Sequence, residues 1–112
     1  MIASVSDTRA SQRAFNRGDT QAALKKATQA IDAEPWAATP YVQRALVEES
    51  QGSLGAALVD LRRAQRREPT NYRHPLLESR IEAELGNTGA ALADFRKAKS
   101  LRPKSPFVGR ER

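Results

Sequence analysis

The sequence predicts an all-α fold, a solenoid in which three helix hairpins stack into one domain of six helices. The first observation behind this prediction is a repeat, because "GAALVDLRRAQRREP" runs from Gly55 to Pro69 and "GAALADFRKAKSLRP" runs from Gly89 to Pro103. The second is a spacing of three or four between apolar residues, which is the period of an amphipathic helix. The third is an Ala-rich composition with only 5% aromatic residues, which favours closely packed helices over a sheet.

The repeat has three copies, each 34 residues from the next. The positions that recur in all three copies are Gly18, Gly52 and Gly86; Ala23, Ala57 and Ala91; Leu24, Leu58 and Leu92; Ala30, Ala64 and Ala98; and Pro35, Pro69 and Pro103. A single helix hairpin cannot bury its apolar face, whereas stacked copies of the hairpin can. A period of this length therefore predicts a solenoid.

Each copy predicts two helices. In the second copy Ala57, Leu58, Leu61 and Ala64 form one apolar stripe on a helix, and the proline after the stripe ends that helix. The glycine before each stripe suits a turn that needs a positive φ, and Asp19 and Ser53, which follow the first two of these glycines, are expected to be helix N-caps. The predicted helices are roughly 4–16, 20–33, 38–50, 54–67, 72–84 and 88–101.

The recurring alanines predict where the helices of a hairpin cross. A small side chain lets two helix axes approach closely, so Ala23, Ala57 and Ala91 are expected at the crossing points. The core is expected to consist mainly of Ala and Leu.

Composition excludes several classes of site. The chain has no Cys, which excludes disulfides and thiolate metal sites. It has no apolar run near 18 residues, so we expect neither a membrane span nor a signal peptide in this chain. The net charge of +6 comes entirely from the C-terminal end of the chain. Residues 1–95 hold twelve basic and twelve acidic residues, whereas residues 96–112 hold seven basic residues and one acidic residue, Glu111.

The glycine before the second helix, the two alanines in it and the proline after it resemble the tetratricopeptide repeat (TPR) family over roughly residues 4–105. Leu61 and Phe95 stand where the family has a large apolar residue. The first helices depart from the family pattern: Tyr41 stands where tryptophan is common, but Asp7 and Pro75 occupy the equivalent places. These differences affect the place where the first helix of one repeat packs against the first helix of the next repeat.

The resemblance implies a right-handed α-solenoid with repeats at 4–37, 38–71 and 72–105. Pro106, Gly109 and an excess of positive charge separately predict a disordered basic tail at 106–112. It also implies that the first helices line a concave groove that accepts an extended peptide or a partner helix. The groove residues expected in this sequence are Thr8, Gln12, Phe15, Val42, Gln43, Leu46, Glu49, Arg73, Leu76, Arg80 and Glu84. Leu46 offers apolar contact, Gln43 a hydrogen bond to a peptide backbone, and Arg73 and Arg80 a cation for an acidic group.

No catalytic set is visible in the sequence. His74 is the only histidine and has neither a cysteine nor a second histidine for a partner, so we interpret it as a surface or capping residue. The clustered glutamates are interpreted as partners in i, i+4 ion pairs, Arg44 with Glu48 and Arg80 with Glu84. Trp36, in the loop after Pro35, is expected to pack over the adjacent hairpins.

These patterns favour a non-catalytic interaction module, a scaffold or adaptor without cofactor or metal that binds a protein or peptide. The alternative is a module that binds nucleic acid or an anionic membrane through a basic stripe formed by Arg62, Arg63, Arg66 and Arg67 and the C-terminal basic residues. A solvated arginine face is the simpler interpretation of that stripe, because no aromatic residues are interleaved with it. The last hairpin is expected to leave an apolar face open, which predicts either a homodimer or a contact with further sequence at the C-terminal end.

Some TPR proteins clamp the C-terminal carboxylate of chaperones with two Lys, two Asn and an Arg. The matching places here hold Thr8, Gln12, Gln43, Arg73 and Leu77, so chaperone-tail binding is not predicted. Three further segments resemble the repeat tails of bacterial O-antigen ligase or polymerase-type membrane proteins. They are "DAEPWAATPYVQRALVEESQG", "EPTNYRHPLL" and "LRPKSPF". If these residues are the whole protein, we expect it in the cytoplasm. If they are the tail of such a membrane protein, an extracytoplasmic location is the alternative.

Overall fold

The computed structural model describes the chain from Ala3 to Arg102, with side chains from Ser6. Over these residues it contains helices and no strand. The helices are α1 (Ala3–Asn16), α2 (Thr20–Ala33), α3 (Thr39–Ser50), α4 (Leu54–Arg67), α5 (Arg73–Glu84) and α6 (Thr88–Leu101). Each boundary lies within one residue of its predicted position, and the all-α prediction is confirmed. The tail predicted at 106–112 and the end of the third repeat lie outside the described residues.

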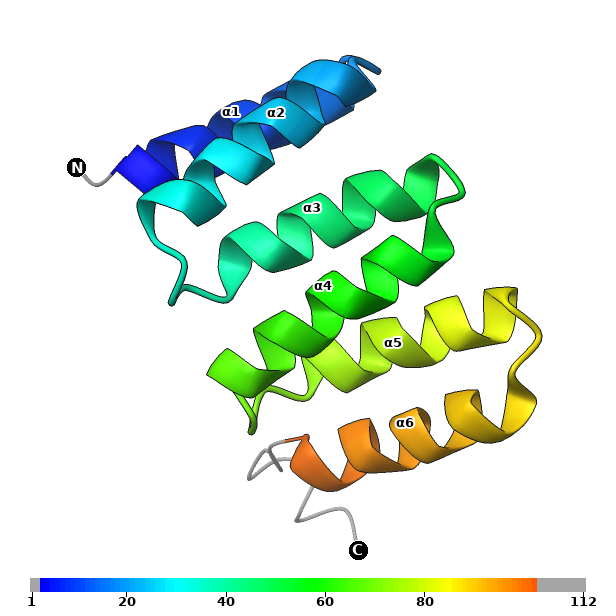
Figure 1. Ribbon diagram of the computed structural model, residues 1–112. Helices are drawn as coiled ribbons and strands as arrows, with labels where there is room; N and C mark the ends of the chain where they lie inside the picture. The colour runs from blue at the N-terminus through cyan, green and yellow to red at the C-terminus, as the bar shows by residue number, and fades with distance from the viewer. Residues whose placement is uncertain (1–2, 103–112) are drawn as a thin grey trace, which may run out of the picture.

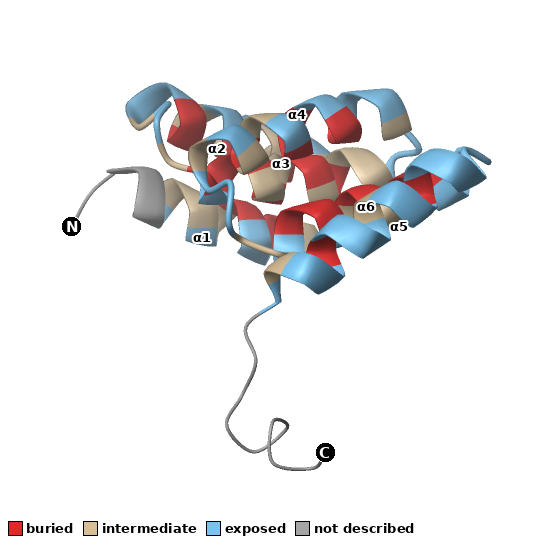
Figure 2. Cartoon of the chain, turned by 90° about the horizontal axis from the view of Figure 1, so that it is seen from below, coloured by how far each residue is buried: buried red, intermediate tan, exposed pale blue. Residues whose placement is uncertain are grey.

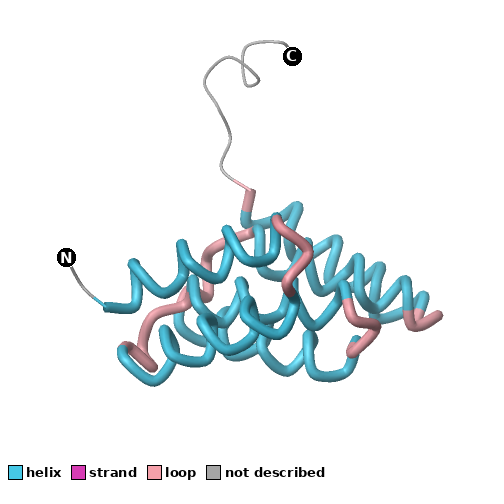
Figure 3. Tube along the Cα trace, turned by 90° about the horizontal axis from the view of Figure 1, so that it is seen from above, coloured by secondary structure: helices cyan, strands magenta, loops and turns pink. Residues whose placement is uncertain are grey.

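Consecutive helices pair into three hairpins, α1 with α2, α3 with α4 and α5 with α6, and the hairpins stack along one direction (Figure 1). Short loops join the helices (Figure 3). The stack measures 46 × 35 × 25 Å. Hairpin α1–α2 forms one end of it and α6 lies at the other.

The turn inside each hairpin depends on its glycine. Gly18, Gly52 and Gly86 have φ angles of 81°, 79° and 84°, in the left-handed region that glycine adopts without steric cost. Asp19 then caps α2, because its Oδ1 accepts a hydrogen bond from the backbone N–H of Ala22 at 3.1 Å. Ser53, the other predicted N-cap, precedes α4 but makes no side-chain capping hydrogen bond, so the left-handed glycine is the turn feature that the three hairpins share.

Two neighbouring glycines should respond to alanine in opposite directions. Gly52→Ala should lower the free energy of unfolding by about 1 kcal/mol, because the new Cβ is strained at positive φ. Gly55→Ala should raise it by up to about 1 kcal/mol, because Gly55 lies within α4 and a Cβ there meets open space. Urea unfolding of the two variants measures both effects. The same sign for both would contradict this explanation of the turn.

The crossing points of the hairpins are the predicted alanines. Ala23 and Ala57 are 0% exposed and Ala91 is 9% exposed. A serine on the facing helix tightens two of the crossings: Ser11 Oγ donates to the carbonyl of Ala23 at 2.6 Å, and Ser79 Oγ donates to the carbonyl of Ala91 at 2.8 Å. The burial of the three alanines and these two bonds are consistent with the predicted crossing points.

The first and second hairpins are each covered by the first helix of the next hairpin. Ile31 of α2 packs against Tyr41 of α3, and Leu58 and Leu61 of α4 pack against Ile81 of α5. Buried residues therefore line the inside of the stack, while the outward surface of the last hairpin is mostly exposed (Figure 2).

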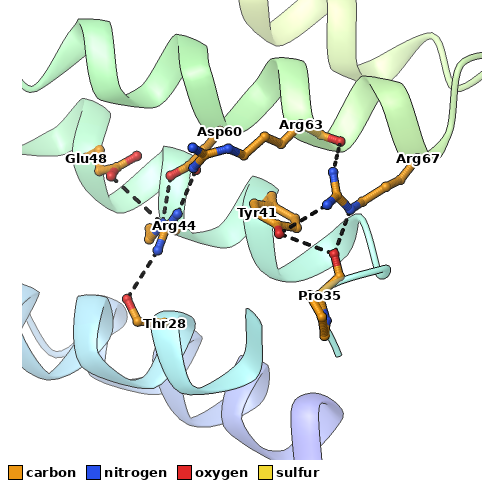
Figure 4. Close-up of polar contacts among 8 residues, drawn as sticks. All are labelled: Thr28, Pro35, Tyr41, Arg44, Glu48, Asp60, Arg63 and Arg67. Carbon is orange, nitrogen blue, oxygen red and sulfur yellow. Dashed lines mark hydrogen bonds and ion pairs between the residues drawn. The ribbon is translucent and has the colours of Figure 1, made fainter. Parts of the chain in front are cut away.

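Polar contacts also join the layers (Figure 4). Arg44 of α3 donates two hydrogen bonds of 2.8 Å to the buried carboxylate of Asp60 in α4, and a third, at 3.4 Å, to Thr28 of α2. The predicted pair of Arg44 with Glu48 is present at 3.9 Å but is the weaker contact. Arg44 therefore connects three helices, and its bidentate pair with Asp60 is the strong part of the connection.

Candidate functional site

The first helices of the three hairpins enclose a hollow of about 380 Å³. Its lining comes from α1 (Phe15), α3 (Leu46, Glu49 and Ser50) and α5 (Arg80 and Glu84). Five of these six residues are among the predicted groove residues. Three helices far apart in the sequence thus contribute to one surface, which we call the concave hollow.

An ion pair between neighbouring repeats forms part of the concave hollow. The guanidinium of Arg80 donates to Glu49 through Nε at 3.0 Å and through a second nitrogen. The sequence-based pairing of Arg80 with Glu84 at i, i+4 is therefore wrong as the main contact. The physical reason is that the stack places Glu49 opposite Arg80, with a bidentate geometry that a neighbour on the same helix does not offer.

The carboxylates of the concave hollow differ in acidity. Burial raises the pKa of Glu49, but its hydrogen bonds with Arg80 and Glu84 outweigh burial, so that pKa lies below its ordinary value. The hydrogen bond with Glu49 raises the pKa of the exposed Glu84. The lining of the hollow thus contains two acidic residues and one basic residue, and the guanidinium of Arg80 is already bound by Glu49.

The other predicted groove residues are distributed around this hollow. Thr8 is partly buried and Gln12 is exposed on α1. Val42 packs against the core clusters, and Arg73 lies over the Tyr72 ring with its guanidinium carbon 5.3 Å from the centroid. Leu76, which is 42% exposed, lines a separate hollow with residues of α6.

Gln43 occupies a different environment from the one expected. It is 8% exposed, and its amide nitrogen donates to Ser11 Oγ at 3.3 Å. This bond connects α1 to α3, at the contact between first helices where the sequence departs from the TPR pattern. A donor already used in the interior is not available to a peptide backbone.

The basic stripe on α4 is largely engaged within the protein. Arg62 pairs with Glu82 at 3.3 Å and Arg63 with Asp60 at 3.1 Å. Arg67 donates to the carbonyl of Pro35 at 2.7 Å and lies 4.3 Å from the centroid of the Tyr41 ring (Figure 4). The side chains of Arg62 and Arg63 remain 51% and 41% exposed, so the stripe is a solvated face whose arginines also pair with groups of the protein. Arg62 joins α4 to α5 and Arg67 joins it to the loop before α3, whereas the pair of Arg63 with Asp60 lies within α4.

Two single residues lie elsewhere than expected. His74 is 4% exposed and its Nε2 is 2.9 Å from Glu68 Oε1, so it is a buried link between α5 and the end of α4 and not a surface residue. Trp36 is 69% exposed and does not pack over the hairpins. The space beside that loop is taken by Tyr41, whose hydroxyl donates to the carbonyl of Pro35 at 3.2 Å.

Sequence reasoning missed Ser50 as a lining residue and Glu49 as the partner of Arg80. Glu49 and Arg80 are 31 positions apart, close to one repeat, so the only signal that pairs them is the repeat length itself. None of the helices within residues 3–102 combines the length and the apolar character needed to cross a membrane.

Comparison with solved structures places these features in a known fold. No protein-family model matches the chain, and no curated protein does. The second TPR of Spaghetti (RPAP3), bound to the HSP90 peptide SRMEEVD, superposes with a TM-score of 0.83 at 19% identity, over 89% of this chain and 93% of that chain. The Arabidopsis OM64 TPR domain has a TM-score of 0.85 at 24% identity, over 96% and 88%.

The TPR2B domain of yeast Sti1, in its complex with pHsp70, has a TM-score of 0.85 at 20% identity, over 88% of this chain and 79% of that chain. The agreement covers nearly all of the described helices in each case. It is an agreement in the arrangement of the helices. The chain therefore has the tetratricopeptide repeat fold, an all-α solenoid.

Proposed function

We propose that the protein is a non-catalytic interaction module that binds a peptide or a partner helix in the concave hollow. The observation that carries this proposal is the hollow itself, whose apolar residues Phe15 and Leu46 lie beside a fixed ion pair of Arg80 and Glu49. Apolar walls with a few positioned polar groups are typical of peptide sites. Two of the solved structures of this fold described above are complexes with HSP90 or Hsp70 partners, which supports a peptide as the ligand class.

The charge of the concave hollow favours a particular peptide. Glu49 and Glu84 outnumber Arg80, and Arg80 is already held by Glu49. An acidic tail would meet net repulsion there, whereas a peptide with an apolar side chain beside Lys or Arg would meet complementary charge. We therefore propose a ligand that is apolar and basic.

The wider context of the chain also belongs to this proposal. The tail of a larger membrane protein, as in the bacterial O-antigen ligase resemblance, would present the same hollow to a partner outside the membrane. A polyanion ligand for α4 is disfavoured, because Arg62, Arg63 and Arg67 already bind groups of the protein.

Selection from a random peptide library displayed on phage tests the ligand class. Enriched peptides should combine Leu or an aromatic residue with Lys or Arg, and the peptide SRMEEVD should not bind. Leu46→Gln should weaken the selected peptides at least about tenfold, because it removes apolar contact without a new charge. Fluorescence anisotropy measures the affinity.

Val59→Gln is the matched control, because Val59 is an exposed apolar residue on α4, 45% accessible, and does not line the concave hollow. It should leave binding unchanged. Equal loss of affinity in both variants, or enrichment of acidic peptides, would contradict the proposed site. Circular dichroism of both variants must match the parent for the comparison to count.

A further inference from the structure

The last hairpin leaves a surface without the cover that its equivalents have. Leu92 and Phe95 are each 50% exposed, whereas Leu58 and Leu61, one repeat earlier, are 6% and 0% exposed. The difference arises because α5 covers Leu58 and Leu61 through Ile81, and no described helix follows α6. Beside Phe95 lies a hollow of about 150 Å³ lined by Tyr72, Leu76, Phe95, Ala98, Lys99 and Arg102.

The charges around this surface are all positive. Arg96 and Lys99 are exposed on α6 and Arg102 is exposed directly after it, and the lining of the hollow includes no acidic residue. We call Leu76, Leu92, Phe95, Arg96, Lys99 and Arg102 the terminal face.

The repeat shows what each cation of the terminal face would meet. Arg96 is equivalent to Arg62, which pairs with Glu82 of the covering helix α5 at 3.3 Å. Lys99 is equivalent to Gln65, whose amide, with its nitrogen toward α5, donates to Glu78 at 3.0 Å. A helix that covers α6 as α5 covers α4 would therefore place carboxylates against both cations.

The third cation inverts a contact of the earlier repeat. Arg102 is equivalent to Glu68, which meets His74 at the start of α5. With Arg in place of Glu, the complementary residue on the covering helix is an acid at the position of His74. The pattern of the covering helix thus follows from the chain itself: acids at the places of His74, Glu78 and Glu82, and apolar residues at those of Leu77 and Ile81.

We propose that the terminal face docks an acidic amphipathic helix of a partner protein, which continues the stack in the place that α5 holds on α4. A second copy of this chain is a poorer occupant, because twofold pairing would oppose Arg96, Lys99 and Arg102 to themselves. Residues 103–112 carry three basic residues and one acid, which does not complement a basic surface. This docking site is separate from the concave hollow and does not depend on it.

The probe is a fluorescein-labelled peptide with the sequence of residues 71–86 carrying His74→Glu. Its counterpart carries Lys at the positions of His74, Glu78 and Glu82. The acidic peptide should bind the full chain, and about 0.5 M salt should weaken it several-fold, because the contacts are charged. The basic peptide should bind at least about tenfold more weakly.

A charge-reversed protein makes the test specific. The double variant Arg96→Glu with Lys99→Glu should prefer the basic peptide, whereas Lys25→Glu, at an exposed position of α2, should keep the original preference. Reversal of preference supports the proposal even where affinity is modest. Equal binding of both peptides, or no binding up to about 1 mM, overturns it. A dimer in sedimentation equilibrium that Phe95→Gln dissociates would also overturn it, because a second copy would then be the occupant.

Discussion

Leu61→Ala should lower the free energy of unfolding by about 3 kcal/mol. Leu61 is 0% exposed and packs with Leu58 and Ile81 between the second and third hairpins, so truncation leaves a cavity that rigid neighbouring helices do not fill. Because the interface between repeats is itself the core of a solenoid, the loss affects the cooperativity of the whole stack. Urea unfolding followed by circular dichroism measures it.

Phe95→Ala is the matched comparison, since Phe95 occupies the equivalent position one repeat later. The ring is 50% exposed, and its removal should cost about 1 kcal/mol despite its larger volume. If both variants lost the same stability, the terminal face would be covered in solution. Repeating the measurement at several protein concentrations identifies self-association as the source of such cover.

Glu78→Gln should stabilise the protein at pH 8 by about 2 to 3 kcal/mol and change its stability little near pH 4. Glu78 is 4% exposed, and burial, with repulsion from Asp94, raises its pKa to about 7 from an ordinary 4.5. Between these two values the folded chain holds a proton that the unfolded chain releases. The stability contributed by this proton is present at low pH and is lost as the pH rises toward 7.

The cause is visible in the repeat. The position equivalent to Glu78 in the second copy is Arg44, which holds Asp60; Glu78 instead faces Asp94, the equivalent of Asp60, across α5 and α6. The third hairpin therefore has an unfavourable carboxylate pair where the second has a salt bridge. Gln removes the charge and keeps the shape, which isolates the electrostatic contribution.

Asp32→Asn is the control for Glu78→Gln, because Asp32 is exposed on α2. The pH dependence of Glu78→Gln is compared with that of this variant between pH 5 and 8. Glu48 also has a raised pKa, and it is present in the parent and in both variants. Its contribution to the free energy of unfolding therefore cancels when each variant is compared with the parent. A flat difference for Glu78→Gln across this range would contradict the assignment.

Within the concave hollow, the residue types were predictable and the contacts were not. Phe15, Leu46 and Arg80 were expected to face the groove from the resemblance, and the structure brings them to one hollow. Gln43 has the same helical register as a groove residue, yet its side chain turns toward Ser11 and is buried. The sequence pattern specifies which face of a helix a residue lies on. Whether a side chain at the edge of that face is exposed or buried depends on the neighbouring helix.

The sequence by itself determined the helices, their order and their turns. These depend on interactions within a few residues: the left-handed glycines such as Gly52, the cap at Asp19 and the apolar stripe of each second helix. The 34-residue period predicted that the hairpins stack, because equivalent residues of successive repeats occupy equivalent positions in a solenoid.

Only the tertiary structure decided the polar partners. Arg80 meets Glu49 and not Glu84, Arg67 meets the carbonyl of Pro35, and Glu78 is buried beside Asp94. Such pairings depend on the lateral offset of one hairpin against the next, which small differences in side-chain volume set across the whole interface. Long charged side chains reach several partners at similar cost within one helix, so the local sequence does not select among them.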